Sequence, residues 1–200
     1  GLDIKIVDDD RAPFGKPVAG LVTLNGLFVG VDVMNSVKQG DPMKEETNLG
    51  PLVSVQQAEK VVMQVKKSCD MGARIIYGGN QEKAFLEPVL MTGVKPGMPV
   101  FDEEVFGPVI PLIIFRNTEE AIALANKTRF GLGVSLFTRD LAKAGDLIDK
   151  FKDGAVFINE LVKSDPRLPF GGTGFSGYGR ELSVQGIREF VNVKTVYIKY

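Results

Sequence analysis

The stretch VIPLIIFRNTEEAIALANKTRFGLGVSLF, residues 109–137, decides the fold class of this chain. Its first part, 109–116, is an almost continuous apolar run, which predicts a buried strand. Asn117 then precedes a segment with acids in its first turn, where the helix dipole favours them, so a capped helix is predicted. A second apolar run, 131–140, predicts another strand. A strand, a helix and a strand in succession are typical of a parallel sheet in an α/β protein.

The same alternation continues on both sides of this stretch. Ser54 and Gln57 match a capping box at the start of a helix that Gly72 ends. The apolar residues of that helix repeat at helical spacing: Ala58, Val61, Val62, Val65 and Cys69. Further strands are predicted at 73–79, 85–94, 155–160 and 195–200, and further helices at 140–154 and near 181–190. Pro88 interrupts 85–94 and predicts an edge or irregular strand there. The predicted fold is α/β, with a mainly parallel sheet flanked by helices.

Residues 1–32 differ from the rest of the chain. Residues 1–7 alternate apolar and polar side chains like a strand, and Asp8, Asp9 and Asp10 follow as an acidic turn. Three consecutive acids seldom converge on one ion, so a solvated turn is expected in place of a metal site. We therefore expect a divergent, strand- and turn-rich segment at 1–32 and an α/β segment at 33–200. The second segment begins with a helix end and an exposed loop.

The overall composition excludes several classes of function. The net charge is −1, so the bulk electrostatics indicate no nucleic-acid or membrane partner. No apolar run is long enough to span a bilayer and no signal peptide opens the chain, which predicts a cytoplasmic protein. Because the chain has no histidine, a Ser-His-Asp triad, a Cys-His pair and a His-ligated metal are excluded within it. The single cysteine fits a reducing compartment.

Three features are candidates for chemistry, each with a structural alternative. Gly172, Gly174 and Gly177 have the spacing of a dinucleotide fingerprint, but a proline-bearing loop precedes them, which favours a structural loop. Cys69 has aliphatic neighbours on its helix face, so it is expected to be a small buried hydrophobe with a raised pKa. Glu103 and Glu104 are either solvated charges or ligand-holding acids; adjacent extended residues point opposite ways, so they could not flank one bond.

Several stretches together resemble the aldehyde dehydrogenase superfamily. They are GDPMKEETNLGPL (40–52), FDEEVFGPVIPLIIF (101–115), TEEAIALANKTRFGLGVSLFTRDL (118–141), GAVFINE (154–160), PFGGTGFSGYGREL (169–182) and VKTVYIK (193–199). They follow the family's order and resemble the C-terminal part of its catalytic domain. The stretches VKSDPRLPFGG (162–172) and SGYGRELS (176–183) are most similar to the bacterial succinate-semialdehyde dehydrogenases. Residues 1–32 do not match, and their first part resembles a hairpin segment of acyl-CoA synthetases, as in a segment of foreign origin.

The resemblance implies roles for four residues. In the family the second Glu of EEVFGP, here Glu104, binds the nicotinamide ribose of NAD or NADP, and the Phe two residues on, here Phe106, packs beside the nicotinamide. Phe170 is expected to line the aldehyde tunnel, and Ser164 is a candidate hydroxyl for a substrate carboxylate. The implied reaction is thiolate attack on an aldehyde, hydride transfer to NAD(P) and release of the acid. The last strand, 193–200, is expected to pair across a homo-oligomer interface.

The sequence departs from the family where the nucleophile is expected. The family's cysteine lies in a GQxC-like stretch upstream of the 40–52 loop, and residues 1–32 hold no cysteine. The cofactor-binding domain, with its phosphate lysine and general-base glutamate, is not matched either. Two hypotheses follow: a segment of an NAD(P)-dependent aldehyde dehydrogenase that is inactive as this isolated chain, or a non-catalytic oligomerisation module derived from that fold.

Overall fold

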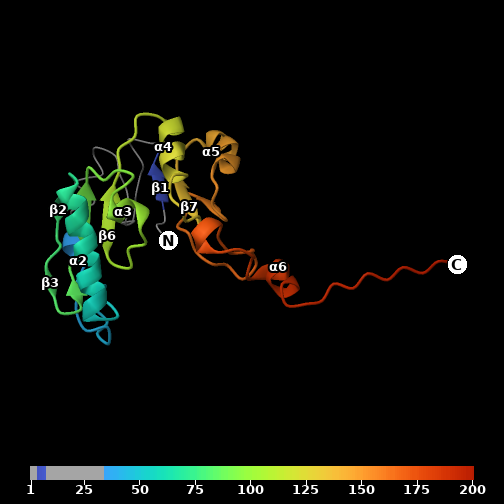
Figure 1. Ribbon diagram of the computed structural model, residues 1–200, viewed down its shortest axis with the longest axis horizontal. Helices are drawn as coiled ribbons and strands as arrows, with labels where there is room; N and C mark the ends of the chain where they lie inside the picture. The colour runs from blue at the N-terminus through green and yellow to red at the C-terminus, as the bar shows by residue number, and fades with distance from the viewer. Residues whose placement is uncertain (1–3, 8–33) are drawn as a thin grey trace.

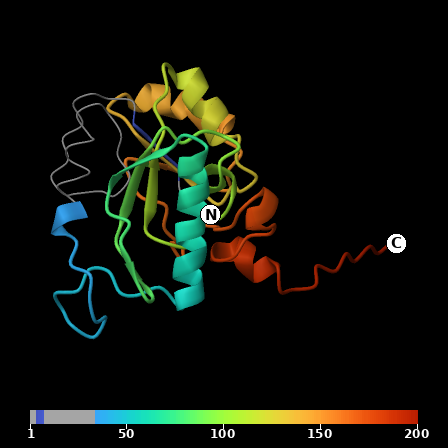
Figure 2. The same ribbon diagram turned by 60° about the vertical axis from the view of Figure 1, so that its left-hand side comes forward.

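The computed structural model describes residues 4–7 and 34–200 of the chain (Figure 1). Within these residues the strands form two three-stranded sheets and a two-stranded hairpin. Helix α2 (Val55–Asp70) runs along the sheet that contains β2 and β6 (Figures 1 and 2). Helices α4 (Thr118–Ala125) and α5 (Leu141–Leu147) lie beside the sheet that contains β1 and β7. The predicted α/β fold is therefore confirmed, with its strands divided between two sheets.

The first sheet has the strand order β2-β5-β6. Its strands are β2 (Arg74–Tyr77), β5 (Val89–Thr92) and β6 (Val109–Leu112). Strand β5 pairs antiparallel with β2 and parallel with β6, so it is the middle strand. Of the two alternatives predicted for 85–94, the irregular strand is confirmed, because the segment breaks at Pro88 into β4 (Phe85–Leu86) and β5, whereas the edge position is wrong. Pro88 is tolerated because it lies before the ladder begins: β4, paired with β3 (Gln81–Glu82), ends two residues earlier.

Helix α2 (Val55–Asp70) covers this sheet together with the short helix α3 (Pro99–Asp102). The predicted N-cap is confirmed, because the Ser54 side chain accepts a hydrogen bond from the backbone N–H of Gln57. The helix ends at Asp70, and Gly72, two residues later, turns the chain away with a φ of 108°, in the region that favours glycine. The buried core between these elements consists of Val61, Val65, Ala73, Leu86, Val89, Met91, Val94, Met98, Val100 and Phe101.

The second sheet has the strand order β1-β7-β8 and is parallel throughout. Its strands are β1 (Ile4–Val7), β7 (Val134–Phe137) and β8 (Val156–Ile158). The strand predicted within residues 1–7 is thus confirmed, whereas the acidic turn after it lies outside the described residues. All four residues of β7 are buried, as expected for a strand with neighbours on both sides and apolar side chains on both faces.

Two helices cover the second sheet. Asn117 caps α4 (Thr118–Ala125) by accepting a hydrogen bond from the backbone N–H of Glu120, as predicted. Helix α5 (Leu141–Leu147) continues as the 3-10 turn η1 (Ile148–Lys150). Leu141 and Ile148 are exposed, whereas Ala144 and Leu147 are buried against the sheet. The buried residues between helices and sheet are Ala121, Ala125, Val134, Leu136, Ala144, Leu147 and Phe151.

The C-terminal part leads away from both sheets (Figure 1). The 3-10 turn η2 (Gly174–Ser176) precedes helix α6 (Ser183–Arg188), and residues 192–200 form no secondary structure. The strand predicted at 195–200 is therefore wrong for this chain taken alone, because an extended segment becomes a strand only when a neighbour supplies ladder partners. Within 4–7 and 34–200, no helix combines the length and apolar character needed to cross a membrane.

Candidate cofactor and substrate site

Glu103 and Glu104 lie in a short loop between α3 and β6. We call residues 103–106 the acidic loop. Pro99 begins α3 and Glu103 caps its end, with φ −100° and ψ 157°, so the chain is already extended at the first glutamate. Glu104 is half-buried and Phe106 is 65% exposed. The loop therefore presents an accessible aromatic ring two residues after a partly sheltered carboxylate.

Three side chains of α2, those of Gln57, Gln64 and Ser68, form hydrogen bonds with the segment 100–106. Gln57 donates a hydrogen bond to the Phe106 carbonyl at 2.9 Å, and Gln64 donates to the Glu103 carboxylate at 2.8 Å. The Gln64 amide also approaches the Glu104 carbonyl at 3.4 Å, a longer and weaker contact. One turn further, the Ser68 hydroxyl accepts from the backbone N–H of Val100 at 3.1 Å. Side chains seven and eleven residues apart on a helix share a face, so α2 anchors 100–106 along its length.

The sequence patterns predicted the apolar face of α2 but no role for Gln64 or Ser68, which are both buried in that face. The signal was present, because Gln57, Gln64 and Ser68 recur at i, i+7 and i+11. Gln57 was assigned to a capping box; its backbone N–H does bond to Ser54, but its side chain contacts Phe106.

The structure separates the roles of the two adjacent acids. The Glu103 carboxylate is engaged by Gln64, and the extended backbone at Glu103 turns successive side chains to opposite sides. Gly107, directly after the loop, packs against α2 so closely that a Cβ there would lie 2.9 Å from a Val61 methyl. The path of the loop is thus set by contacts with α2 on both sides of Glu104.

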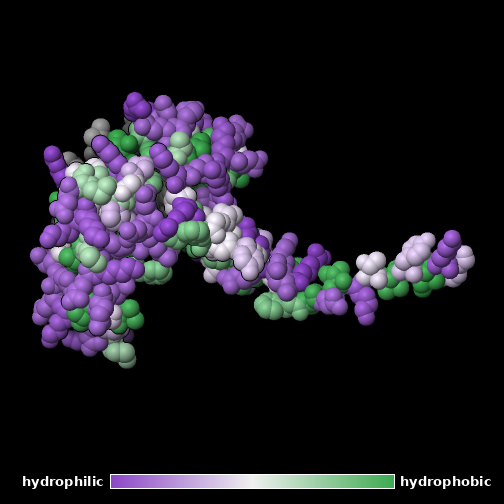
Figure 3. Space-filling view, in the orientation of Figure 1, coloured by the Kyte–Doolittle hydropathy of each residue, from purple (hydrophilic) through white to green (hydrophobic). Residues whose placement is uncertain are grey.

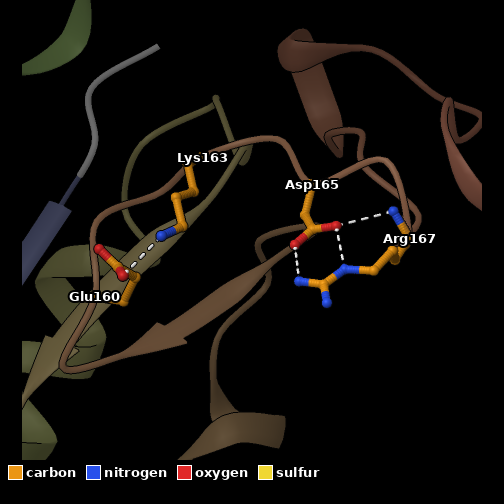
Figure 4. A network of polar contacts seen from close by, with 4 residues as sticks. All are labelled: Glu160, Lys163, Asp165 and Arg167. Atoms are coloured by element: carbon orange, nitrogen blue, oxygen red, sulfur yellow. Dashed lines mark hydrogen bonds and ion pairs between the residues drawn. The ribbon is translucent and has the colours of Figure 1, made fainter.

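The second group of predicted residues follows β8. Ser164 is exposed, in a segment where Lys163 pairs with Glu160 at 2.7 Å and Arg167 pairs with Asp165 at 2.6 Å (Figure 4). The Arg167 guanidinium, as the stronger cause, and its backbone N–H hold the pKa of Asp165 well below its usual range. Both cations near Ser164 in the sequence therefore already have carboxylate partners.

Phe170 is half-buried and fixed by its backbone. Its N–H donates to the Glu181 carbonyl at 2.9 Å, and its own carbonyl accepts from Glu181 at 2.8 Å. These two bonds form a bridge that closes the glycine-rich loop 171–180. The predicted residues thus fall into two groups, the acidic loop beside the first sheet and Ser164–Phe170 after the last strand of the second.

The glycine-rich loop is structural, as the sequence favoured. The backbone N–H groups of Thr173 and Phe175 donate to the carbonyls of Gly131 and Arg129, so they are not available to cradle a phosphate. The loop packs tightly on the chain: a Cβ on Gly174, where φ is 59°, would lie 2.5 Å from the Arg129 carbonyl oxygen. Glycine is needed here for backbone conformation and close approach.

Cys69 lies near the end of α2 and is half-buried against the hydrophobic core between α2 and the first sheet. Burial raises the pKa of its thiol, and Asp70 adds to the effect, although a backbone hydrogen bond involving Ile75 opposes it. The raised pKa agrees with the prediction, but the side chain is half-buried where full burial was predicted. In the described part of the chain, no group of three or more acidic, Cys or His residues could hold a metal.

Comparison with known proteins identifies the family. The model of the aldehyde dehydrogenase family matches residues 30–196. The chain belongs to the aldehyde dehydrogenase family. It is 44% identical over 168 residues to succinate-semialdehyde dehydrogenase [NADP(+)] 1 of Mycobacterium tuberculosis. It is 45% identical over 166 residues to the probable succinate-semialdehyde dehydrogenase [NADP(+)] of Synechocystis. Each match covers 82% of this chain, which spans 37% of the length of either relative.

Solved structures agree with this assignment. The succinic semialdehyde dehydrogenase of Streptococcus pyogenes, in complex with NADP+, superposes with a TM-score of 0.84 at 35% identity; the match covers 98% of this chain and 41% of that one. The betaine aldehyde dehydrogenase of Staphylococcus aureus, in complex with NAD+, gives a TM-score of 0.79 at 32% identity, over 83% of this chain and 34% of that one. The chain therefore has the fold of a part of an aldehyde dehydrogenase.

Proposed function

We propose that residues 33–200 are part of the catalytic domain of an NADP+-dependent succinate-semialdehyde dehydrogenase, which converts the aldehyde to a carboxylic acid. The observation that carries this is the identity of 44–45% with two enzymes of that name over most of this chain. The architecture of the acidic loop supports it, because two amide side chains of α2 hold the segment that contains Glu104 and Phe106.

The acidic loop fits a nicotinamide ribose. A carboxylate accepts hydrogen bonds from two neighbouring hydroxyls at once, and bonds to a charged acceptor are the stronger kind, so Glu104 suits this ligand. Phe106 is exposed beside it and offers a flat apolar face. When bound, the cofactor supplies the hydride acceptor. The work of this chain is to orient it: Glu104 fixes the ribose and Phe106 restrains the ring from one side.

The segment after β8 suits a substrate with a carboxylate. Ser164 provides an exposed hydroxyl, and Lys163 and Arg167, near it in the sequence, could bind a carboxylate if they left their present partners Glu160 and Asp165. Phe170 provides apolar surface a few residues further along. A semialdehyde has an anionic end and an uncharged reactive end, so a polar position followed by an aromatic wall matches it.

We also propose that these 200 residues do not catalyse the complete reaction by themselves. The reaction needs a thiolate in the site, and the chain has one cysteine. Cys69 is packed against the aliphatic core at the end of α2, and burial raises its pKa, so it is a poor nucleophile. The nucleophile of the proposed activity is therefore expected outside this sequence.

A second candidate function is assembly without catalysis. The observation that favours it is the C-terminal tail, 192–200, in which Val193, Val196, Tyr197 and Ile198 are all exposed. Figure 3 shows apolar and polar side chains interspersed along this tail. Such a segment can add to the open edge of a sheet in another subunit. In this alternative the chain serves as an oligomerisation module.

A hybrid enzyme tests the proposed function. Residues 30–196, the part that matches the family, replace the corresponding part of the Synechocystis relative, and reduction of NADP+ by succinate semialdehyde is followed by absorbance. We expect turnover within about a hundredfold of the parent enzyme, because the replaced part is 45% identical. A folded hybrid that binds NADP+ but does not oxidise the semialdehyde, while it oxidises another aldehyde, would refute the substrate proposal.

The isolated chain provides the complementary test. Mixed with succinate semialdehyde and NADP+, the 200-residue protein should show no thiol-dependent turnover. A covalent thioester on Cys69, detected by mass spectrometry, would contradict the proposal that this chain lacks the nucleophile. A chain that forms stable oligomers while the hybrid remains inactive towards every aldehyde would favour the assembly alternative.

A further inference from the structure

The side chain of Gln64 combines burial with an incomplete set of hydrogen bonds. It is only 4% exposed, in the middle of α2. Its amide nitrogen has two acceptors, the Glu103 carboxylate at 2.8 Å and the Glu104 carbonyl at 3.4 Å, whereas its amide oxygen is buried with no partner. A buried oxygen without a donor is unfavourable, and an apolar residue of similar volume would avoid it.

The orientation of the amide follows from its neighbours. Exchange of the amide oxygen and nitrogen would direct the oxygen at the Glu103 carboxylate and the Glu104 carbonyl, two acceptors that cannot donate to it. The observed orientation leaves one acceptor unpaired and satisfies two others. Gln64 thus donates hydrogen bonds from its amide nitrogen while its own amide oxygen stays unpaired. This indicates that the structure needs the amide nitrogen as a donor at this position.

We infer that Gln64 is a positioning residue that selects which of the two adjacent glutamates faces the ligand. By binding the Glu103 carboxylate against α2, it fixes the backbone at Glu103, and the extended conformation there turns Glu104 to the opposite side. The role of Glu104 towards a ribose rests on the proposed function. The sorting of the two carboxylates rests only on the contacts of this chain. Gln57 and Ser68 hold the two flanks, 106 and 100, so Gln64 acts at the centre of a held segment.

Amide hydrogen exchange on the 200-residue chain tests the inference directly. In Gln64→Met the side-chain volume is kept and the donor is lost, so the acidic loop should open more often. We expect the N–H groups of Glu103 and Gly107, which bond to Pro99 and Val105, to exchange about tenfold faster. The N–H of Val134, which bonds to the Ala155 carbonyl in the buried middle strand β7 of the second sheet, exchanges only when that sheet opens and should be unchanged.

Gln56 offers a matched control on the same helix, because it is exposed. The substitution Gln56→Met should leave both reporter amides at the wild-type rate. Equal rates in Gln64→Met and wild type would overturn the inference. Faster exchange of Val134 by the same factor as Glu103 would also overturn it, because Gln64 would then serve general stability.

The variant Gln64→Glu distinguishes an effect of the hydrogen bond to Glu103 from an effect of side-chain packing alone. In Gln64→Glu the introduced carboxyl faces the Glu103 carboxylate, and two such groups share one proton at low pH and repel when both are ionised. Protection of the Glu103 and Gly107 amides, corrected for intrinsic exchange, should be near wild type in acid and fall as the pH rises. A pH-independent loss would contradict the inference. Because no cofactor is needed, these measurements decide the role of Gln64 even if the hybrid enzyme is inactive.

Discussion

At the residue scale, the pair Glu103 and Glu104 shows how neighbours with the same side chain acquire different environments. Glu103 ends α3 and binds a buried amide, whereas Glu104 occupies the next position on an extended backbone. Period-two alternation in extended chain is enough to separate them. The family resemblance distinguishes the two by position in a motif, and the contacts with α2 supply the physical reason for the distinction.

Replacement of Glu104 tests the ribose contact. In the hybrid enzyme, Glu104→Gln keeps the shape and one acceptor but removes the charge, so the KM for NADP+ should rise about tenfold. The KM for succinate semialdehyde should change little. The same substitution at exposed Glu59, on the outer side of α2, serves as the control. An unchanged affinity for NADP+ in Glu104→Gln would remove this residue from the cofactor site.

The thiol of Cys69 makes a prediction about pH. Since burial raises its pKa, the thiolate is the minor form at neutral pH and its share grows as the pH rises through the folded pKa. Alkylation by iodoacetamide, followed by mass spectrometry, should therefore be slower than alkylation of free glutathione at neutral pH and should accelerate in base. Rapid labelling at neutral pH would show a lowered pKa and contradict the packing described for this residue.

At the element scale, α2 packs on the acidic loop without spare volume. A Cβ added at Gly107 would lie 2.9 and 3.0 Å from the two methyl groups of Val61, closer than real Cβ contacts allow. We expect Gly107→Ala to reduce the free energy of unfolding by about 1–3 kcal/mol, as overpacking does. Chemical denaturation of the isolated chain provides the measurement.

The pair Gly107 and Val61 can be tested as a unit. If the cause is the clash, Gly107→Ala combined with Val61→Ala should destabilise less than the sum of the single substitutions, by more than about 0.5 kcal/mol, because the added methyl fills the space that is left. Simple additivity would locate the effect of Gly107→Ala elsewhere, in the backbone of the loop. Gly145, whose added Cβ would meet no atom within 4 Å, provides the neutral site for comparison.

The elements also show what the sequence could and could not reveal. Periodicity and capping signals correctly predicted α2, α4 and the strands β2, β6, β7 and β8, because each depends on local spacing. For 85–94 the sequence predicted the interruption at Pro88 but not whether the strand lies at the edge or the centre, because that depends on which strands pair with β5. The helical spacing of Gln57, Gln64 and Ser68 was visible in the sequence, but the role of Gln64 was not, because it depends on a contact with Glu103, 39 residues away.

At the scale of the whole molecule, the chain combines two packed sheets with surfaces that it does not cover itself. Phe106, Val53 and Ile114 are largely exposed, at 65%, 93% and 70%. Single exposed apolar residues are ordinary on a protein surface, but here one of them lies in the acidic loop. This pattern fits a segment that works together with the further parts present in relatives of which it spans 37% of the length.

The C-terminal tail allows the last prediction, on assembly. Within 192–200 no residue pairs in a strand, yet the tail carries exposed apolar residues in an extended segment. Pairing with another copy would satisfy its backbone groups, so the chain should form oligomers in solution, and removal of 193–200 should lower the mass measured by light scattering.

In a strand Val196 and Ile198 share one face, whereas Thr195 and Lys199 share the other. Val196→Asp with Ile198→Asp should therefore reduce the mass more than Thr195→Asp with Lys199→Asp, because only the first pair places charge on an apolar face. A chain that is monomeric at every concentration, or whose mass does not change on deletion, would show that the tail has another role.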